Sequence, residues 1–261
     1  PKIGYPDKWR DWSGLATSRD AYVANLMAAN AFNYRFNLAK IGKPVDKSEW
    51  GMSPQTVNAY YNPLQNEIVF PAAILQPPFF DPKADDALNY GGIGAVIGHE
   101  MTHGYDDQGS RFGPTGNFEN WWTEADSKNF AGLTGKLVKQ FDQYKVDGQA
   151  VNGHLTLGEN IADLGGLATA YDALQKASAG KEDAKIDGFT RDQRFFFNWA
   201  TVWRTKYTPE NAKVRLATDP HAPAQFRAIG APSNMPSYAA AFQCKAGDPM
   251  VRSGDQQVVI W

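Results

Sequence analysis

Hydrophobic side chains recur at helical spacing along most of the chain. Segments with this period predict helices over 21–38, 130–144, 191–207 and 209–216. The sequence from Thr123 to Asp126 has the pattern of a helix N-terminal cap, and Thr208 followed by Pro209 marks the start of the last segment. The patterning therefore predicts a mostly helical protein.

The spacing changes between Gln55 and Phe70, where apolar residues alternate on both sides of the turn sequence 62–66. Alternation around a central turn predicts a β-hairpin. The proline-rich segment 77–82 then interrupts regular structure before the next apolar stretch. The glycine-rich segment 89–94 follows a polar run rather than a strand, which disfavours a phosphate-binding loop. The predicted fold class is α+β, predominantly α, with one small sheet.

Composition limits the class of protein without assigning a function. The chain has 261 residues, 43% of them hydrophobic, and a net charge of −2, so it can bury a large core and lacks the basic excess typical of nucleic-acid or anionic-membrane binding. Cys244 is the only cysteine, which excludes an internal disulfide and a cysteine-based zinc site. No apolar run reaches the ~18 residues of a membrane span, and residues 1–6 lack the features of a signal peptide, so any targeting sequence is expected upstream.

Two histidines and a glutamate form the first candidate site. His99, Glu100 and His103 fit the pattern H-E-x-x-H within an apolar stretch that predicts a helix. Because His103 follows His99 by four positions, both imidazoles lie on one helix face and can bind one ion, while Glu100 stays free to act on water. The alternative is a helix whose polar face carries two histidines by chance. The pattern favours a hydrolase with one zinc ion per chain.

Glu159 and Asp163 extend this candidate site. A catalytic zinc has three protein ligands and an open position for water, and two histidines with one glutamate are an established set. Glu159 can supply the third ligand. Asp163 lies one turn later on a predicted helix that runs to about Lys176, where it can accept the free ring N–H of a ligand histidine. A solvated helix face is the alternative, but the flanking residues are apolar and a buried unpaired carboxylate is costly.

Four separated motifs carry a resemblance to a known family. They are NAYY at 58–61, GHEMTHGYDD at 98–107, GENIAD at 158–163 and DPHAP at 219–223. In this order, with a terminal Trp261, they resemble the signature set of the neprilysin family of zinc metallopeptidases, M13. The resemblance covers nearly the whole chain and implies a thermolysin-like (gluzincin) catalytic domain, in which an edge strand of the small sheet binds peptide.

The resemblance implies substrate-binding roles that spacing alone does not give. Asn58 and Ala59 match the edge-strand positions that hold the substrate backbone, a binding mode in which an extended peptide adds a strand. His221 and Arg227 match positions that steady the oxyanion and the substrate carbonyl, although His221 could equally lie in a plain loop. The family's apolar pocket for the side chain after the cleaved bond corresponds to Ile74, Phe79, Val96, Val202 and Trp203. Core packing is the alternative for these five.

The implied activity is zinc-dependent hydrolysis of oligopeptides on the amino side of apolar residues. Zinc on His99, His103 and Glu159 would activate a water and polarise the peptide carbonyl. Glu100 would take the proton of that water and pass it to the leaving amine, while Asp163 orients a ligand histidine. By resemblance, His221 would share the negative charge of the oxyanion with the zinc.

Family members also carry a large N-terminal helical portion that nothing in this sequence resembles. Residues 1–261 are therefore expected to be the C-terminal catalytic portion. Its expected partners are the peptide substrate and that N-terminal portion, in the same precursor or as a second chain. An extracellular or periplasmic, secreted location is expected.

Two other functions stay open at this stage. The chain could be a zinc-retaining peptide-binding module with little activity in the absence of the N-terminal portion, although the intact Glu100 argues against this. It could also hydrolyse a non-peptide substrate. Asn58 and Ala59 argue against that second alternative, because strand addition needs a peptide backbone.

Overall fold

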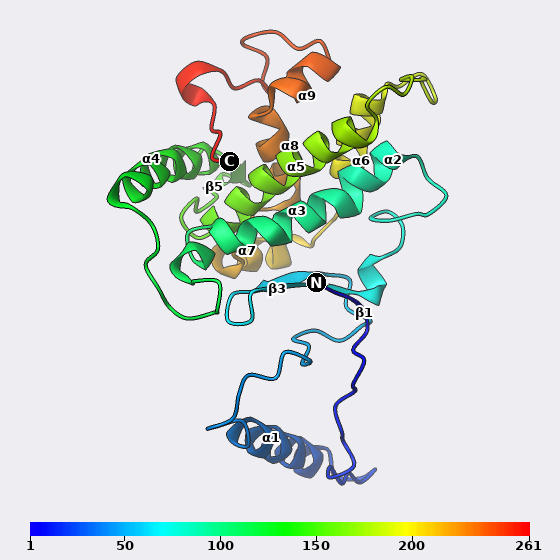
Figure 1. Cartoon of the computed structure of the whole chain (residues 1–261), viewed down its shortest axis with the longest axis vertical. Coiled ribbons are helices and arrows are strands. Elements are labelled where there is room, and N and C mark those ends of the chain that lie inside the picture. The colour runs from blue at the N-terminus through cyan, green and yellow to red at the C-terminus, as the bar shows by residue number, and fades with distance from the viewer. The chain divides into compact units, whose positions relative to one another are not determined.

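The computed structural model describes residues 1–261, which form two compact units. The smaller unit is Tyr5–Ser53, and the larger one combines Pro1–Gly4 with Pro54–Trp261. Figure 1 shows the elements of both units. Every candidate site residue lies in the larger unit.

The smaller unit is built around one helix, α1 (Tyr22–Leu38), which confirms the helix predicted over 21–38. The Arg10 guanidinium stacks on the rings of Trp12 and Phe36, and its Nη2 donates a hydrogen bond to Asn33 Oδ1 at 2.8 Å. No residue of α1 is buried. The apolar side chains of α1 therefore add little buried area to this chain.

A three-stranded sheet in the larger unit has the order β1-β3-β2. β2 (Tyr60–Asn62) and β3 (Glu67–Pro71) run antiparallel with Tyr60 opposite Val69, which confirms the predicted hairpin. β1 (Lys2–Gly4) pairs in parallel with β3 on its other side. β2 is therefore an edge strand, and the residues just before it, Asn58 and Ala59, lead into that edge. A second, two-stranded hairpin joins β4 (Lys145–Val146) to β5 (Gln149–Ala150).

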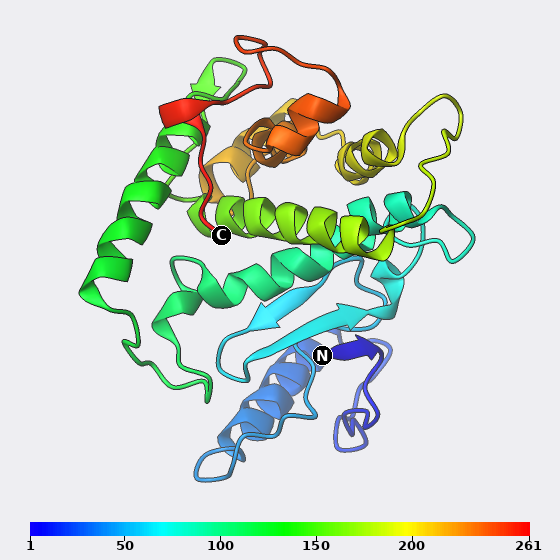
Figure 2. The ribbon, with the colours of Figure 1, turned by 45° about the horizontal axis from the view of Figure 1, so that its top comes forward.

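Two closely packed helices form the centre of the larger unit. They are α3 (Ala95–Thr102) and α5 (Leu157–Ala177), and they confirm the helices predicted around His99 and Glu159. A Cβ atom on Gly98 would lie 2.6 Å from the Gly166 carbonyl oxygen, and one on Gly166 would lie 2.3 Å from the His99 backbone nitrogen. Only glycine permits this approach. Figure 2 shows α3 running between the sheet and α5.

α3 continues without a break from α2 (Asp86–Asn89) through a π-helical turn, Tyr90–Gly94. The glycine-rich segment 89–94 is thus helical, in keeping with the sequence argument against a phosphate-binding loop. Short 3-10 turns complete this part of the chain: Ala72–Ile74 after the sheet, His103–Tyr105 directly after α3, and Gly109–Arg111.

The remaining helices are α4 (Glu124–Phe141), α6 (Arg191–Val202), α7 (Pro209–Thr218), α8 (Ala224–Ser233) and α9 (Pro236–Ala241). A last 3-10 turn is Gly254–Gln256. Two predicted caps are present, because the Thr123 hydroxyl accepts the Asp126 N–H and the Thr208 hydroxyl accepts the Asn211 N–H. The sequence patterns did not predict α8 and α9.

The helix predicted over 191–207 is too long, since α6 ends at Val202. Thr208 has an extended backbone (φ −66°, ψ 154°) in order to cap α7. A residue before proline is also disfavoured in the helical region, and Pro209 follows it directly. Residues 203–207 therefore turn the chain between the two helices rather than extend the first.

The main core surrounds α5. Phe195 and Trp199 of α6 are fully buried there with Leu137, Ile161, Leu167 and Leu174. A smaller cluster of Ala59, Phe70, Ile74, Ile93 and Val96 joins the sheet to α3 and its preceding turn. None of the helices combines the length and the apolar composition that a bilayer crossing needs.

Candidate metal centre and active site

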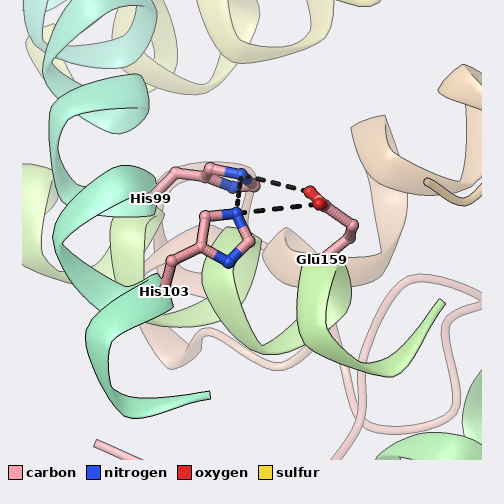
Figure 3. A group of neighbouring side chains, drawn as sticks. All are labelled: His99, His103 and Glu159. Atoms are coloured by element: carbon pink, nitrogen blue, oxygen red, sulfur yellow. Dashed lines mark hydrogen bonds and ion pairs between the residues drawn. The ribbon is translucent and has the colours of Figure 1, made fainter. Parts of the chain in front are cut away.

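Three potential metal ligands converge from three elements. His99 lies in the last turn of α3, His103 in the 3-10 turn that follows, and Glu159 in the first turn of α5. The His99 and His103 Nε2 atoms are 3.0 Å apart, and Glu159 Oε2 is 3.2 Å from His99 Nε2. One donor atom from each residue lies within 4.8 Å of the other two. Figure 3 shows the two rings and the carboxylate pointing at one another.

Each histidine ring is fixed from behind by a carboxylate. His99 Nδ1 donates to Asp163 Oδ1 at 2.8 Å, and His103 Nδ1 donates to Asp106 Oδ2 at 2.7 Å. In the neutral rings that metal binding requires, the remaining proton lies on Nδ1, and both Nε2 lone pairs then face each other and the Glu159 carboxylate. Glu159 Oε2 is buried and accepts no hydrogen bond. Three electron-pair donors this close together fit a cation such as zinc, for which two histidines and a glutamate are an established ligand set.

The charges around the ligands favour a bound cation. Burial lowers the pKa of His99, but Asp163 and Glu159 outweigh burial and raise it to about 10. Burial also opposes ionisation of Glu159, yet the His99, His221 and Arg227 groups hold its pKa well below the ordinary range. A proton or a metal ion is therefore strongly attracted to this point, and the two compete for the same nitrogen.

Arg227 of α8 binds the carboxylate that orients His99. Its Nε donates to Asp163 Oδ2 at 2.7 Å and its Nη2 to Asp163 Oδ1 at 2.6 Å, and the guanidinium stacks on the Trp203 ring at 3.9 Å. The Arg227 and Asp163 side chains are both buried. Burial raises the pKa of Asp163, but the Arg227 charge outweighs burial and keeps the net shift downward. The arrangement holds Asp163 ionised behind the ligand histidine.

Glu100 lies on α3 between the two ligand histidines in sequence and is 5% exposed. Its carboxylate makes no hydrogen bond within the chain. Burial raises its pKa, and the neighbouring His99 and His103 oppose that rise. A carboxylate with a raised pKa beside a metal centre is suited to accept and return a proton.

His221 reaches the centre from the loop between α7 and α8. Its Nε2 lies 3.2 Å from Glu159 Oε2, and its Nδ1 donates to Asp219 Oδ1 at 2.7 Å. The Asp219 carboxylate also accepts the His221 backbone N–H at 2.9 Å. The ring is therefore held in place beside the ligand carboxylate, with 37% of its side chain exposed.

The predicted substrate-binding residues lie in two places. Asn58 is exposed before the β2 edge and Ala59 is buried beneath it. Ile74, Phe79 and Val96 belong to the small cluster under the sheet. The pair at the end of α6, Val202 and Trp203, is separate from that cluster, and Trp203 lies against Arg227. The positions of these five residues are compatible with core packing and with a substrate pocket.

Two acidic residues were missed as partners by the sequence argument, although both lie in motifs that it quoted. Asp106 follows His103 by three positions, and Asp219 precedes His221 by two. Short spacings of this kind allow a carboxylate to reach the ring of a nearby histidine, so they could have indicated both contacts. The Arg227–Asp163 contact joins α8 to α5, so no short spacing in the sequence could have indicated it.

Comparison with known proteins gives consistent matches. The sequence model of peptidase family M13 matches residues 58–258. Neprilysin-3 of Drosophila melanogaster is 42% identical over 259 residues, which is 95% of this chain and 33% of that protein. Human endothelin-converting enzyme 1 is 42% identical over 258 residues, which is 95% of this chain and 34% of that protein. The chain thus spans about a third of the length of these relatives.

Solved structures match over the entire chain. The crystal structure of the Mycobacterium tuberculosis zinc metalloprotease ZMP1 in complex with an inhibitor has a TM-score of 0.96 and 50% identity, covering 100% of this chain and 41% of that one. PEPO from Lactobacillus rhamnosis has a TM-score of 0.89 and 36% identity, covering 99% of this chain and 40% of that one. The α+β fold with a small sheet is therefore shared with these proteins.

Proposed function

Because the chain belongs to peptidase family M13, we propose that it is the catalytic portion of a zinc-dependent endopeptidase that hydrolyses oligopeptides. The observation that carries the proposal is the convergence of His99, His103 and Glu159, with a carboxylate behind each ring. One zinc ion per chain would be held by these three side chains. When bound, zinc would polarise the peptide carbonyl and acidify a water molecule.

Glu100 is the proposed general base. It is buried beside the ligand histidines, and its raised pKa suits a group that takes a proton and then gives it up. In the proposed reaction Glu100 accepts a proton from the attacking water. It then passes that proton to the amine that leaves when the peptide bond breaks.

His221, Asp163 and Arg227 have supporting roles in this proposal. The His221 ring would donate to the carbonyl oxygen as negative charge develops there, and Asp219 keeps that ring oriented. Asp163 fixes the tautomer of His99. Arg227 keeps Asp163 ionised, and its Nη1, which makes no hydrogen bond in the chain, is available for the substrate carbonyl.

The substrate would bind as an added strand along the β2 edge, with its backbone on Asn58 and Ala59. The Asn58 amide makes no side-chain hydrogen bond within the chain and is exposed. Cleavage on the amino side of apolar residues would follow if Ile74, Phe79, Val96, Val202 and Trp203 receive the side chain after the cleaved bond. Ile74, Val96 and Val202 are buried and Phe79 and Trp203 are half-buried, which supports an apolar pocket at these positions.

The relatives are about three times as long as this chain. We therefore propose that residues 1–261 function with an N-terminal portion, in the same precursor or as a second chain. A secreted location, extracellular or periplasmic, remains part of this proposal.

Cleavage of a quenched fluorogenic peptide with one apolar residue tests the proposed function. The zinc-loaded protein should cleave it on the amino side of the apolar residue, as identified by mass spectrometry of the products. A chelator should abolish cleavage, and added zinc should restore it. A protein that binds zinc and peptide without cleaving would instead be a binding module, and one that cleaves only non-peptide esters or amides would contradict a peptidase.

A further inference from the structure

A cavity of about 390 Å³ opens beside the metal centre. Its lining includes Asn58, His221, Arg227 and Arg215 of α7. Because His221 also contacts the ligand Glu159, the cavity lies directly next to the proposed cleavage point. A peptide residue spans ~3.3 Å when extended, so only residues close to the cleaved bond can reach this cavity.

The cavity wall combines apolar surface with positive charge. Val146, Trp203 and Leu216 supply apolar contacts, while Arg215, Arg227 and His221 supply cationic or donor groups. No aspartate or glutamate lines it. A wall of this composition suits a ligand group with an aliphatic stem and a carboxylate end.

Of the two arginines in this wall, Arg215 is the more exposed and makes fewer hydrogen bonds within the chain. One guanidinium nitrogen, Nη2, is paired with Asp219 Oδ2, and the guanidinium is stacked over the Tyr207 ring at 4.7 Å from its centroid. Its other N–H groups make no hydrogen bond within the chain, and 45% of the side chain is exposed. Arg227, by contrast, is buried and donates two hydrogen bonds to Asp163. Arg215 is therefore held in position with donors to spare.

We propose that this cavity is a subsite for a peptide carboxylate and that Arg215 determines specificity for it. The proposal rests on the proposed peptidase function and adds a substrate class to it, namely peptides with a carboxylate one or two residues from the cleaved bond. Val146 and Leu216 contact the aliphatic stem, and Arg215 donates to the carboxylate. That carboxylate belongs to an acidic side chain or to the end of the peptide, since both present the same group.

Matched peptides test the subsite. The two peptides of the first pair differ only in having glutamate or glutamine one or two residues from the cleaved bond. The two peptides of the second pair both end at that distance, one with a free carboxylate and the other with an amide. The zinc-loaded protein should cleave the carboxylate member of at least one pair with a kcat/KM about five-fold higher. The pair that shows the preference identifies the source of the carboxylate.

Substitutions at Arg215 then assign the preference to this residue. Arg215→Gln should bring the ratio of kcat/KM within the pair close to 1, Arg215→Lys should restore part of it, and Arg215→Glu should invert it. Lys213→Gln removes the same charge from α7 at a position outside this cavity and should keep the wild-type ratio. The same ratios should appear in peptide dissociation constants measured with Glu100→Gln.

Three outcomes would overturn the subsite. The first is equal cleavage of both members of each pair by the wild type. The second is an Arg215→Gln variant that loses activity on both members alike, since Arg215 would then act through Asp219 and His221. The third is an equal loss of preference in Lys213→Gln. Failure of the zinc-loaded wild type to cleave any of the peptides would count against the proposed function instead.

Discussion

The two candidate ligand histidines are oriented by different carboxylates, and only one of these carboxylates is paired with a buried arginine. Asp163 receives two hydrogen bonds from Arg227, whereas Asp106 accepts the backbone N–H groups of Gln108 and Gly109. Each arrangement holds a carboxylate against the Nδ1 atom of a candidate ligand ring. The residues behind the ligands should therefore govern metal affinity as well as geometry.

Asp163→Asn should weaken zinc binding by about 10- to 100-fold, because the amide keeps an acceptor for His99 Nδ1 but loses the charge that makes the ring a strong donor. Competition against a chromophoric chelator measures this change. Asp192→Asn is a matched control, since Asp192 accepts hydrogen bonds from Tyr171 and Gln175 outside the centre. Equal zinc affinities in the two variants would show that Asp163 does not support the ligand.

Zinc binding should also weaken as the pH falls. The carboxylates outweigh burial and raise the pKa of His99 to about 10, so below that pH a proton occupies the ring and has to leave when zinc binds. The apparent association constant should fall about ten-fold per pH unit for each proton displaced. Calorimetric titration in buffers of different ionisation enthalpy counts the protons released. An affinity independent of pH between about 6 and 8 would contradict this competition.

The sequence predicted His99 and His103 as a pair of candidate ligands because their four-residue spacing places them on one helix face. Glu159 lies on a different helix and was predicted because a catalytic zinc needs a third protein ligand. Asp163 was predicted from its position one turn after Glu159. The pairing of Arg227 with Asp163 and the cavity around Arg215 could not be predicted, because both depend on how α7 and α8 pack against the rest of the chain. Partners brought together by tertiary packing have no local pattern.

The close packing of α3 on α5 positions the candidate metal ligands. Gly166→Ala should destabilise the fold by about 1–3 kcal/mol and reduce zinc occupancy, because the new Cβ would lie 2.3 Å from the His99 backbone nitrogen. Gly132→Ala in α4 is the control, since a Cβ there meets no atom within 4 Å. That control should stabilise the fold by about 0.5–1 kcal/mol through helix propensity. Denaturant unfolding with metal analysis measures both, and an undisturbed Gly166→Ala protein would contradict a tight contact.

Elements with strong local signals were predicted well. The helix after Thr123 and the helix after Thr208 each have a cap, and the hairpin at 60–71 has alternation and a turn. The predicted end of α6 lay too far along the chain, because the apolar pattern continues past Val202 whereas the helix ends there and the chain turns before Pro209. α8 was missed, because it contains Pro232 and no side chain caps its N-terminus.

Within the whole molecule, the candidate metal centre lies in one compact unit that includes residues 54–261. The family match at 58–258 coincides with this unit. The smaller unit, Tyr5–Ser53, has a helix without buried residues. The relatives are about three times as long as this chain. Peptide turnover by residues 1–261 alone would indicate a complete catalytic centre, whereas peptide binding without turnover would indicate a binding module.

Zinc content and peptide turnover, measured on the same preparations of wild type and Glu100→Gln, test whether this chain is a zinc peptidase with Glu100 as its base. We expect one zinc per chain in both proteins and a loss of turnover in the variant of at least about 100-fold, because the proposed metal ligands stay intact while the proposed general base is removed. Undiminished turnover in Glu100→Gln, or full turnover in a wild type stripped of zinc, would contradict it.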